Sequence, residues 1–291
     1  MGKVDMTEMD NAGGDRDAGD EEQAIRVLVF GAHPDDAEVY APGLLVRHAQ
    51  LGNQVKIISV TDGRSGHHEI PPDELVRVRR AEAQQAGERI GAEYITWDFP
   101  DGALEPTLAV RRAIISEIRR FAPHLVLTHR PIDYHPDHRA VGTAVQDASY
   151  LVTVPHVCPD VPALRSDPVV AYMCDLFTRP APLQPDVILD VSAEFDLAVQ
   201  MAACHTSQFF QWLPWHDGVL DQVPAEADAR FKWLCGWFAN LHRQRREHFP
   251  AALVARGLPL DESRVIEFFE VSQYAGKADG QHLNRLFPGR L

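Results

Sequence analysis

Residues 25–36 read Ile-Arg-Val-Leu-Val-Phe-Gly-Ala-His-Pro-Asp-Asp, an apolar run that passes through a glycine into a polar turn. An apolar run of this length without polar alternation is typical of a strand that is buried on both faces of a parallel sheet. Residues 37–51 then place apolar side chains at helical spacing and stop at Gly52. The folded part of the chain therefore opens with a strand followed by a helix.

The same order of strand and helix repeats along the chain. We expect strands at 55–61, 93–97, 124–128, 169–173 and 187–191, and helices at 73–90, 107–121, 137–151, 192–210 and 225–247. Residues 265–271 read either as a strand or as an exposed amphipathic segment. Alternating strands and helices fold as βαβ units. The predicted fold class is therefore α/β, a Rossmann-like, mostly parallel sheet with helices on both faces and a C-terminal helical extension from about residue 210.

The 291-residue chain is acidic, because 28 basic residues stand against 42 acidic ones and give a net charge of −14. Such a surface repels phosphate, which argues against nucleic acid and against an anionic membrane as partners. Residues 1–22 alone contain eight acidic and two basic residues. Because residues 1–23 also contain few large apolar side chains, we predict a flexible acidic tail there and a single domain over 24–291.

Two further features bear on where the protein works. The sequence has no run of about 18 apolar residues, so no membrane insertion is expected, and its N-terminus lacks the apolar region of a secretory signal. The four cysteines (Cys158, Cys174, Cys204 and Cys235) are widely spaced and include no Cys-x-x-Cys pair. That usage suits buried thiols in a reducing compartment, and a cytoplasmic protein is predicted.

Polar residues follow several of the predicted strands, at the carboxyl ends where open parallel sheets bind ligands. His33 and Asp36 follow the first strand, and His135 and His138 follow the strand at 124–128. Each pair is three residues apart at a predicted helix start, so both members lie on one face and could chelate a metal ion. Two histidines and a carboxylate leave an open position on Zn²⁺, as in catalytic sites. Fe²⁺, Mn²⁺ or Co²⁺ also accept such ligands.

Further ionisable groups accompany these pairs. Asp35 is placed to take a proton from a water molecule, and His135 to polarise a carbonyl or protonate a leaving group. A turn with a helix cap is the alternative explanation for His-Pro-Asp-Asp on its own. Two clusters of this kind at strand ends of one sheet favour a functional site.

The pattern Ala-His-Pro-Asp-Asp at 32–36, with His-Pro-Asp-His at 135–138, resembles the PIG-L/LmbE-like deacetylases. Further matches are Thr-Asp-Gly at 61–63, Arg-Arg-Ala-Glu at 79–82, Pro-Asp-Gly at 100–102 and His-Thr-Ser-Gln at 205–208, so the similarity runs from about residue 25 to 208, and more weakly to 269. That family includes zinc-dependent de-N-acetylases of N-acetylglucosaminyl-phosphatidylinositol and of thiol-cofactor precursors. One departure is that Ala37 precedes Glu38, which displaces the acid that usually follows the paired aspartates.

The resemblance implies a role for each matching residue. It implies metal ligation by His33, Asp36 and His138, a general base at Asp35, a second catalytic histidine at His135, and a carboxylate at Asp137 that orients His135. The implied reaction is hydrolysis of an acetamide to acetate and a free amino sugar, with a metal cofactor, Zn²⁺ above all.

Residues that contact the substrate are harder to assign from the sequence. Arg64 follows the second strand, Tyr134 precedes His135, and His205 lies on a predicted helix; we take these three as candidate substrate-binding residues. The alternatives are a solvated loop arginine, a packed aromatic ring and a core histidine. Trp212 and Trp215 would form a lid over a sugar, pack against the C-terminal helices, or contact a second copy of the chain in a homo-oligomer.

Arg79 and Arg80 could include one substrate ligand, but an exposed ion-pairing face of the helix is the favoured interpretation.

The prediction that follows is a metal-dependent hydrolase that removes the N-acetyl group from a small N-acetylglucosamine conjugate. The rival within the class is a C–N amidase that cleaves a thiol-cofactor conjugate. A metallophosphoesterase would need two metals about 3.5–4 Å apart and cations facing the phosphate. A non-catalytic binding relative would have lost Asp35, Asp36 or His138, and all three are present.

Overall fold

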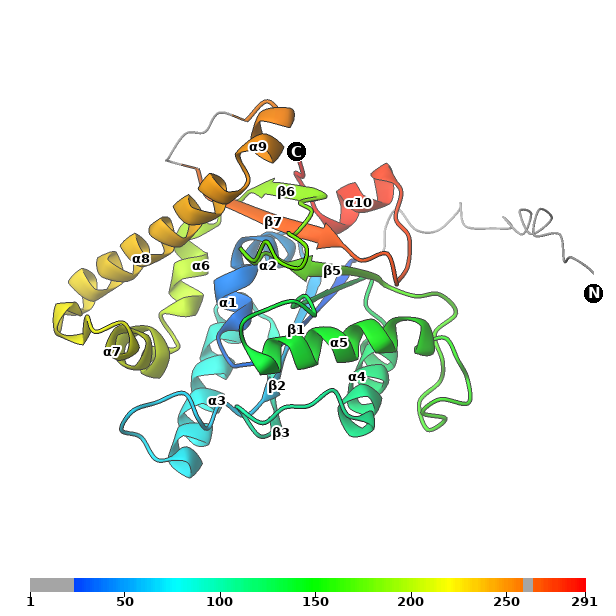
Figure 1. Cartoon of the computed structure of the whole chain (residues 1–291), viewed down its shortest axis with the longest axis horizontal. Coiled ribbons are helices and arrows are strands. Elements are labelled where there is room, and N and C mark those ends of the chain that lie inside the picture. The colour runs from blue at the N-terminus through cyan, green and yellow to red at the C-terminus, as the bar shows by residue number, and fades with distance from the viewer. Residues whose placement is uncertain (1–23, 259–263) are drawn as a thin grey trace, which may run out of the picture.

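Seven strands form one sheet in the computed structural model, which describes residues 24–258 and 264–291 (Figure 1). Their order across the sheet is β3-β2-β1-β4-β5-β7-β6. The pairs among β1 to β5 are parallel, and β7 runs antiparallel to both β5 and β6. The strands are β1 (Arg26–Gly31), β2 (Gln54–Thr61), β3 (Glu93–Phe99), β4 (Leu125–Thr128), β5 (Val169–Met173), β6 (Val187–Asp190) and β7 (Ile266–Val271). The predicted Rossmann-like, mostly parallel sheet is confirmed.

Helices cover both faces of this sheet, because successive side chains of the buried strands point to opposite sides. Val27 and Val29 of β1 pack on one side against α1 (Asp36–Tyr40), α2 (Pro42–Gln50), α3 (Pro72–Glu88), α6 (Phe195–Ala202) and α10 (Gly280–Leu286). Leu28 and Phe30 pack on the other side against α4 (Leu108–Phe121) and α5 (Pro136–Leu151). The apolar strand at 25–30 therefore lies between two cores, as its sequence predicts.

Two predicted helices are interrupted. The helix expected at 37–51 is divided between α1 and α2, and Ala41 between them leaves helical geometry directly before Pro42, which begins α2. The helix expected at 192–210 consists of α6 and, after a turn, the π-helix η1 (Gln208–Trp212), which continues into α7 (Leu213–His216). After the 3₁₀ turn η2 (Leu220–Gln222) follow α8 (Ala227–His248) and α9 (Pro250–Ala255).

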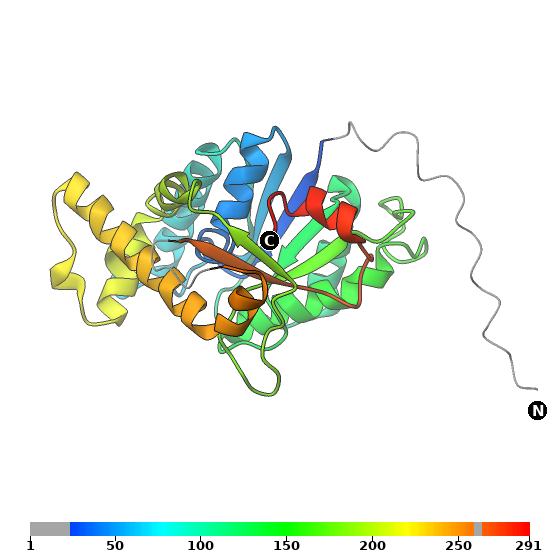
Figure 2. The same ribbon diagram turned by 90° about the horizontal axis from the view of Figure 1, so that it is seen from above.

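The C-terminal part of the chain completes the sheet. Residues 265–271, for which the sequence left two possibilities, form the buried strand β7 between β5 and β6. α8 packs on β7 (Figure 2), and Phe287, directly after α10, packs its ring against Phe269 with centroids 5.5 Å apart. The stretch expected to form a C-terminal extension therefore also supplies a strand of the sheet.

Among the helices of residues 24–258 and 264–291, each is too short or too polar to span a membrane.

Candidate active site

The strand order brings three polar loops together at one edge of the sheet. β1 lies between β2 and β4, and all three are parallel, so their carboxyl ends meet at the same edge. The loops that follow them are residues 32–35, 62–71 and 129–135, and the first and third run directly into α1, which begins at Asp36, and α5, which contains His138. The turn after β3, which contains Asp101, joins them, since Asp101 Oδ2 accepts from the Ser65 amide at 3.0 Å.

The three residues predicted as metal ligands lie together. His138 Nε2 is 3.3 Å from His33 Nδ1 and 3.4 Å from Asp36 Oδ1. His33 Nδ1 is 3.7 Å from Asp36 Oδ2. Ligand atoms on a tetrahedral Zn²⁺ with bonds of about 2.0–2.1 Å stand about 3.3 Å apart. The set of two imidazoles and one carboxylate therefore fits a divalent metal ion.

Carboxylates lie behind both histidines, as is usual for metal-binding imidazoles. His33 Nε2, the nitrogen remote from His138, is 3.1 Å from Asp101 Oδ1 and 3.3 Å from Asp137 Oδ2. His138 Nδ1 is 3.2 Å from Asp133 Oδ1. A proton on each of these outer nitrogens leaves the inner nitrogen with a lone pair, which is the tautomer that binds a metal.

Asp36 is held by the turn that carries it. Its Oδ2 accepts hydrogen bonds from the amides of Ala32 at 2.7 Å and His33 at 2.8 Å. His129 Nε2 lies 3.0 Å from the same oxygen. These contacts fix the carboxylate so that its other oxygen, Oδ1, faces His138.

Asp137 differs from its expected placement. Its carboxylate accepts from the amides of Gly102 at 2.7 Å and Leu104 at 3.1 Å, and it faces His33 instead of His135. The backbone amide of Asp137 donates to His135 Nδ1 at 3.2 Å, which caps α5. The reason is its position in the first turn of α5, where the side chain is buried against residues 101–104. Asp137 thus contacts His135 through its backbone and His33 through its carboxylate.

Asp35 combines a strained backbone with a partly buried carboxylate. Its φ of 148° is rare for any residue with a side chain. The carboxylate is 14% exposed and its Oδ2 is 3.0 Å from Arg79 Nη2. Burial raises the pKa of Asp35 to about 6, against the opposing effect of Arg79. A carboxylate of this pKa, next to the candidate ligands, suits a general base near neutral pH.

Arg79, which was expected with Arg80 on an exposed face of the helix, is instead a buried residue of the site. Its side chain is buried, and its guanidinium donates to the carbonyls of Pro34 at 2.7 Å and Gly63 at 3.3 Å in addition to its contact with Asp35. The expectation of an exposed face holds for Arg80, which pairs with Asp98 at the surface at 2.8 Å. Helical spacing could have predicted the burial of Arg79, because residues 75, 79, 82, 83 and 86 form the buried face of α3.

His129 is a second residue that the sequence analysis did not assign. It directly follows β4, and its ring is stacked on that of His138 with centroids 3.9 Å apart. Its contact with Asp36 gives an alternative set of three metal-binding groups, Asp36, His129 and His138. Two other sets are His33 with His135 and His138, and His33 with Asp101 and Asp137. Each set shares a residue with the predicted one, so all describe the same region of the molecule.

The other residues predicted to act on or bind the substrate differ in their exposure to solvent. His135 is half-buried, with its ring 4.5 Å from that of His33, and burial together with His33 and His138 lowers the pKa of His135. Tyr134 is exposed, with its ring 5.7 Å from those of His135 and His138. Arg64 is partly exposed on the second loop and pairs with Asp62, whose Oδ2 lies 2.8 Å from Arg64 Nε.

His205 lies beneath the site and has no exposed surface. Its Nε2 is 3.4 Å from Glu38 Oε1, and Tyr94 donates to the same carboxylate at 3.5 Å. A substrate cannot reach a side chain at this depth, so the structure supports the core-histidine alternative over substrate contact. Glu38, which Ala37 displaces from the usual position, is buried as the partner of His205.

Comparisons with known proteins agree with this geometry. Residues 28–149 match the PIG-L family model, described as GlcNAc-PI de-N-acetylase. A diacetylchitobiose deacetylase of Thermococcus kodakarensis is 27% identical over 190 residues, which are 63% of this chain and 70% of the relative. A 4-oxalmesaconate hydratase of Pseudomonas putida is 24% identical over 199 residues, 64% of this chain and 74% of the relative.

The fold is shared with solved structures as well. An N,N'-diacetylchitobiose deacetylase from Pyrococcus horikoshii superposes with a TM-score of 0.67 at 20% identity, over 87% of this chain and 85% of that one. The motifs at 32–36 and 135–138 lie within the matched family region and converge on one site. Residues 28–149 are therefore similar to the PIG-L family, and the chain shares the fold of a solved deacetylase of this kind.

Proposed function

We propose that this protein is a metal-dependent hydrolase that removes the N-acetyl group from a small molecule containing N-acetylglucosamine. The observation that carries the proposal is the position of Asp35. A partly buried carboxylate with a pKa raised to about 6 lies beside a set of two histidines and an aspartate that fits a divalent metal. The match of residues 28–149 to the PIG-L family model and the similarity to a diacetylchitobiose deacetylase support the same reaction class.

A divalent metal in this site would polarise the amide carbonyl and lower the pKa of a water molecule. Asp35 then accepts the proton of the attacking water, and Arg79 holds its carboxylate in place. His135, at the partly exposed side of the site, stabilises the developing negative charge on the carbonyl oxygen. Protonated Asp35 or His135 returns the proton to the departing nitrogen. The products are acetate and a free amine.

The charges around the site favour a neutral acetamido sugar. The described acidic residues near the ligands are Asp35, Asp62, Asp101, Asp133 and Asp137, whereas Arg64 is paired with Asp62 and Arg79 with Asp35. A polycarboxylate, such as the substrate that the hydratase relative's name describes, would meet these acids, and Arg64 and Arg79 are already engaged by aspartates. A phosphate ester is disfavoured for the same reason.

The C–N amidase reaction on a thiol-cofactor conjugate remains the alternative within the class. The same centre would attack a different amide, so the two reactions differ only in the acyl group and the amine that are released.

For the metal we propose Zn²⁺, and the same nitrogen and oxygen donors accept Fe²⁺, Mn²⁺ or Co²⁺. We also propose a cytoplasmic location, in line with four cysteines that are all unpaired.

The test is acetate release from a panel of N-acetylglucosaminides. Protein stripped with a chelator and reloaded with each metal is incubated with N-acetylglucosamine, N,N'-diacetylchitobiose, and the inositol and malate conjugates of N-acetylglucosamine. We expect acetate and free amine in equal amounts, most with Zn²⁺. Asp35→Asn should lower kcat by a factor of about 10² to 10⁴ while the bound metal, measured by elemental analysis, stays the same.

The matched control is Asp98→Asn, because Asp98 is an exposed acid on β3 that pairs with Arg80 at the surface. Its activity should equal that of the parent. Release of an amine without acetate from a thiol-cofactor conjugate would favour the amidase. Hydration of oxalmesaconate together with no acetate from any N-acetylglucosaminide would refute the proposal.

A further inference from the structure

Two segments far apart in the sequence form one wall beside the candidate active site. The loop between β2 and α3 approaches η1 and α7 (Figure 1). Gln208 Nε2 donates to the carbonyl of Gly66 at 3.1 Å, and His67 Nε2 lies 2.9 Å from Gln211 Oε1. These contacts hold the loop and the helical segment in register.

Aromatic rings line this wall in nearly parallel planes. The rings of His68 and Trp215 are 4.6 Å apart with an interplanar angle of 5°, and those of Trp212 and Trp215 are 5.3 Å apart at 23°. Trp215 is nevertheless 48% exposed. We call His68, Trp212 and Trp215 the aromatic platform. Three parallel rings that leave an indole half exposed present a flat apolar surface to solvent.

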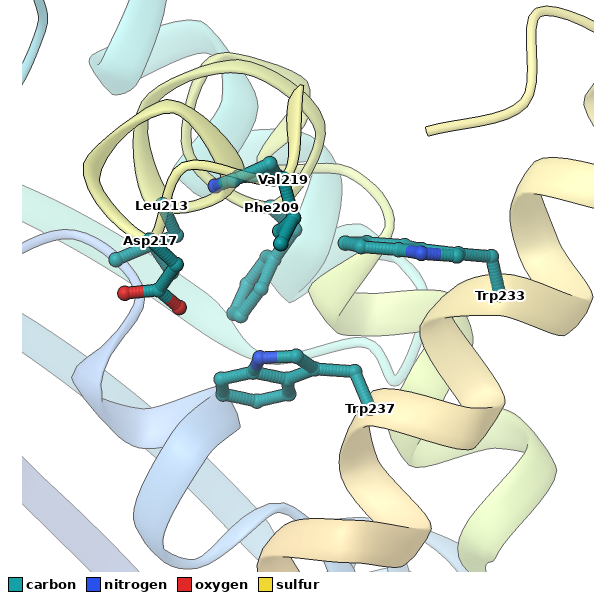
Figure 3. A pocket seen from close by; sticks show the side chains of 7 residues that line it. Phe209, Leu213, Asp217, Val219, Trp233 and Trp237 are labelled. Atoms are coloured by element: carbon teal, nitrogen blue, oxygen red, sulfur yellow. The ribbon is translucent and has the colours of Figure 1, made fainter. Parts of the chain in front are cut away.

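The opposite side of the same helical segment is anchored in the core. Phe209 points toward Trp237 of α8, and both line a small pocket together with Leu213 and Trp233 (Figure 3). Phe209 is buried, and its ring is 5.6 Å from that of Trp237. Because the segment is fixed from behind, the exposed rings are held in place before any ligand arrives. Preorganised aromatic surfaces of this kind lower the entropy lost on binding.

The aromatic platform lies next to the proposed base through a single side chain. A Cβ atom added to Gly66 would lie 3.9 Å from Trp212 Cδ1 and 3.1 Å from Arg79 Nη1, so both side chains border this glycine. The other nitrogen of that guanidinium, Nη2, is 3.0 Å from Asp35 Oδ2. Gly66 and Arg79 thus connect the aromatic platform to Asp35 through consecutive contacts.

We propose that the aromatic platform binds a second sugar ring, the one joined to the N-acetylglucosaminyl unit, so that the substrate is a glycoside of at least two rings. This inference rests on the proposed deacetylase function. The apolar C–H face of a pyranose matches a flat indole surface, and aromatic rings prefer such stacked contacts. An anionic conjugate is a poorer match, since the two arginines near this wall, Arg64 and Arg79, are each paired with an aspartate.

The test compares one ring with two. For the parent and for Trp215→Ala, kcat/KM is measured on N-acetylglucosamine and on N,N'-diacetylchitobiose. We expect the disaccharide to monosaccharide ratio of kcat/KM to fall about tenfold in Trp215→Ala, through KM, and to recover in Trp215→Phe, which keeps a flat ring. Tyr150→Ala is the control, since Tyr150 is also an exposed aromatic residue but lies at the far end of α5, and its ratio should equal that of the parent.

A binding measurement separates this inference from the proposed function. In the Asp35→Asn background, calorimetry with N,N'-diacetylchitobiose should show a Kd about tenfold weaker after Trp215→Ala. If the parent releases no acetate but the disaccharide binds in a Trp215-dependent way, the proposed function fails and the aromatic platform stands. An unchanged ratio and Kd would overturn the platform. So would a Trp215→Ala variant that binds the disaccharide normally but sediments as a smaller species, because the rings would then join two copies.

Discussion

Arg79 and Arg80 are neighbours in the sequence with entirely different environments. Arg79 is buried against Asp35 and two loop carbonyls, so it links the turn after β1 to the turn after β2. Arg80 lies at the surface beside Asp98. The planar guanidinium can contact three partners at once, whereas a lysine ammonium is a point charge that cannot span them.

The first prediction follows from this contrast. Arg79→Lys should lower kcat/KM by a factor of about 10 to 100, because the base is no longer held at its position. Arg80→Lys, the matched change one residue later, should leave activity as it was. Acetate release measures both, and elemental analysis should find the same metal content in each variant. Equal activities would show that Arg79 does not position Asp35.

His242 makes stability depend on pH. It is buried, its Nδ1 lies 3.1 Å from the Ile266 carbonyl, and burial together with Arg245 and Arg246 lowers the pKa of His242 to about 3. The unfolded chain binds a proton at the ordinary pKa of about 6.5, so protons favour unfolding. The stabilising contribution is complete above pH 6.5 and is lost as the pH falls toward 3.

The second prediction measures that loss. Between pH 7 and pH 5 the parent should lose about 2 kcal/mol more unfolding free energy than His242→Asn, which cannot take up the proton. Urea unfolding at the two pH values gives both numbers. If parent and variant lose the same amount, His242 does not carry this dependence.

At the level of the helices, α5 and α8 each contain a glycine, but the surroundings of the two glycines differ. A Cβ on Gly142 of α5 would stand 2.4 Å from the His129 carbonyl oxygen, so the helix approaches the end of β4 at a distance that only glycine permits. Gly236 in the interior of α8 faces open space within 4 Å. The first glycine therefore lets α5 carry His138 close to β4, and the second has no packing role.

The third prediction uses this pair. Gly142→Ala should lower the free energy of unfolding by about 1–3 kcal/mol, because the backbone around His129 has to move. Gly236→Ala should raise it by up to about 1 kcal/mol, since alanine is the better helix former. Chemical denaturation of both variants provides the measurement. A loss of similar size in both would contradict the close approach of α5 to β4.

Some strands of the sheet can be predicted from the sequence, and others cannot. Strands β1, β2 and β4 and their polar loops are predictable, because an apolar run before a polar turn is a local pattern. β7 is not, since the pattern at 265–271 suits two structures and the choice is made by pairing with β5 and β6. The burial of Arg79 and His129 likewise depends on partners from other loops, and charged residues are exposed by default.

For the whole molecule, the acidic balance divides into two parts. Residues 1–22 account for a net charge of −6, and the remaining 34 acidic and 26 basic residues for −8. Several of the latter acids surround His33 and His138, where a divalent cation would offset them. The acidic start contains none of the candidate site residues, whereas the end of the chain completes the sheet.

The fourth prediction compares the two ends. Deletion of residues 1–23 should leave kcat/KM and the melting temperature unchanged. Deletion of residues 265–291 removes β7, whose Phe268 and Phe269 are fully buried, and should abolish cooperative unfolding. Circular dichroism during heating tests both. A cooperative transition in the shortened C-terminal variant would show that β1 to β5 form a core on their own.

The backbone of Asp35 has a consequence for how this protein would respond to selection. A residue with a side chain at a φ of 148° lowers stability by an amount on the order of 1–3 kcal/mol, in a chain whose total margin is about 5–15 kcal/mol. The proposed base is thus also a weak point of the fold. Screening variants for heat resistance alone would reward relaxation of this turn, and the most robust molecules to emerge would be those that had given up the reaction.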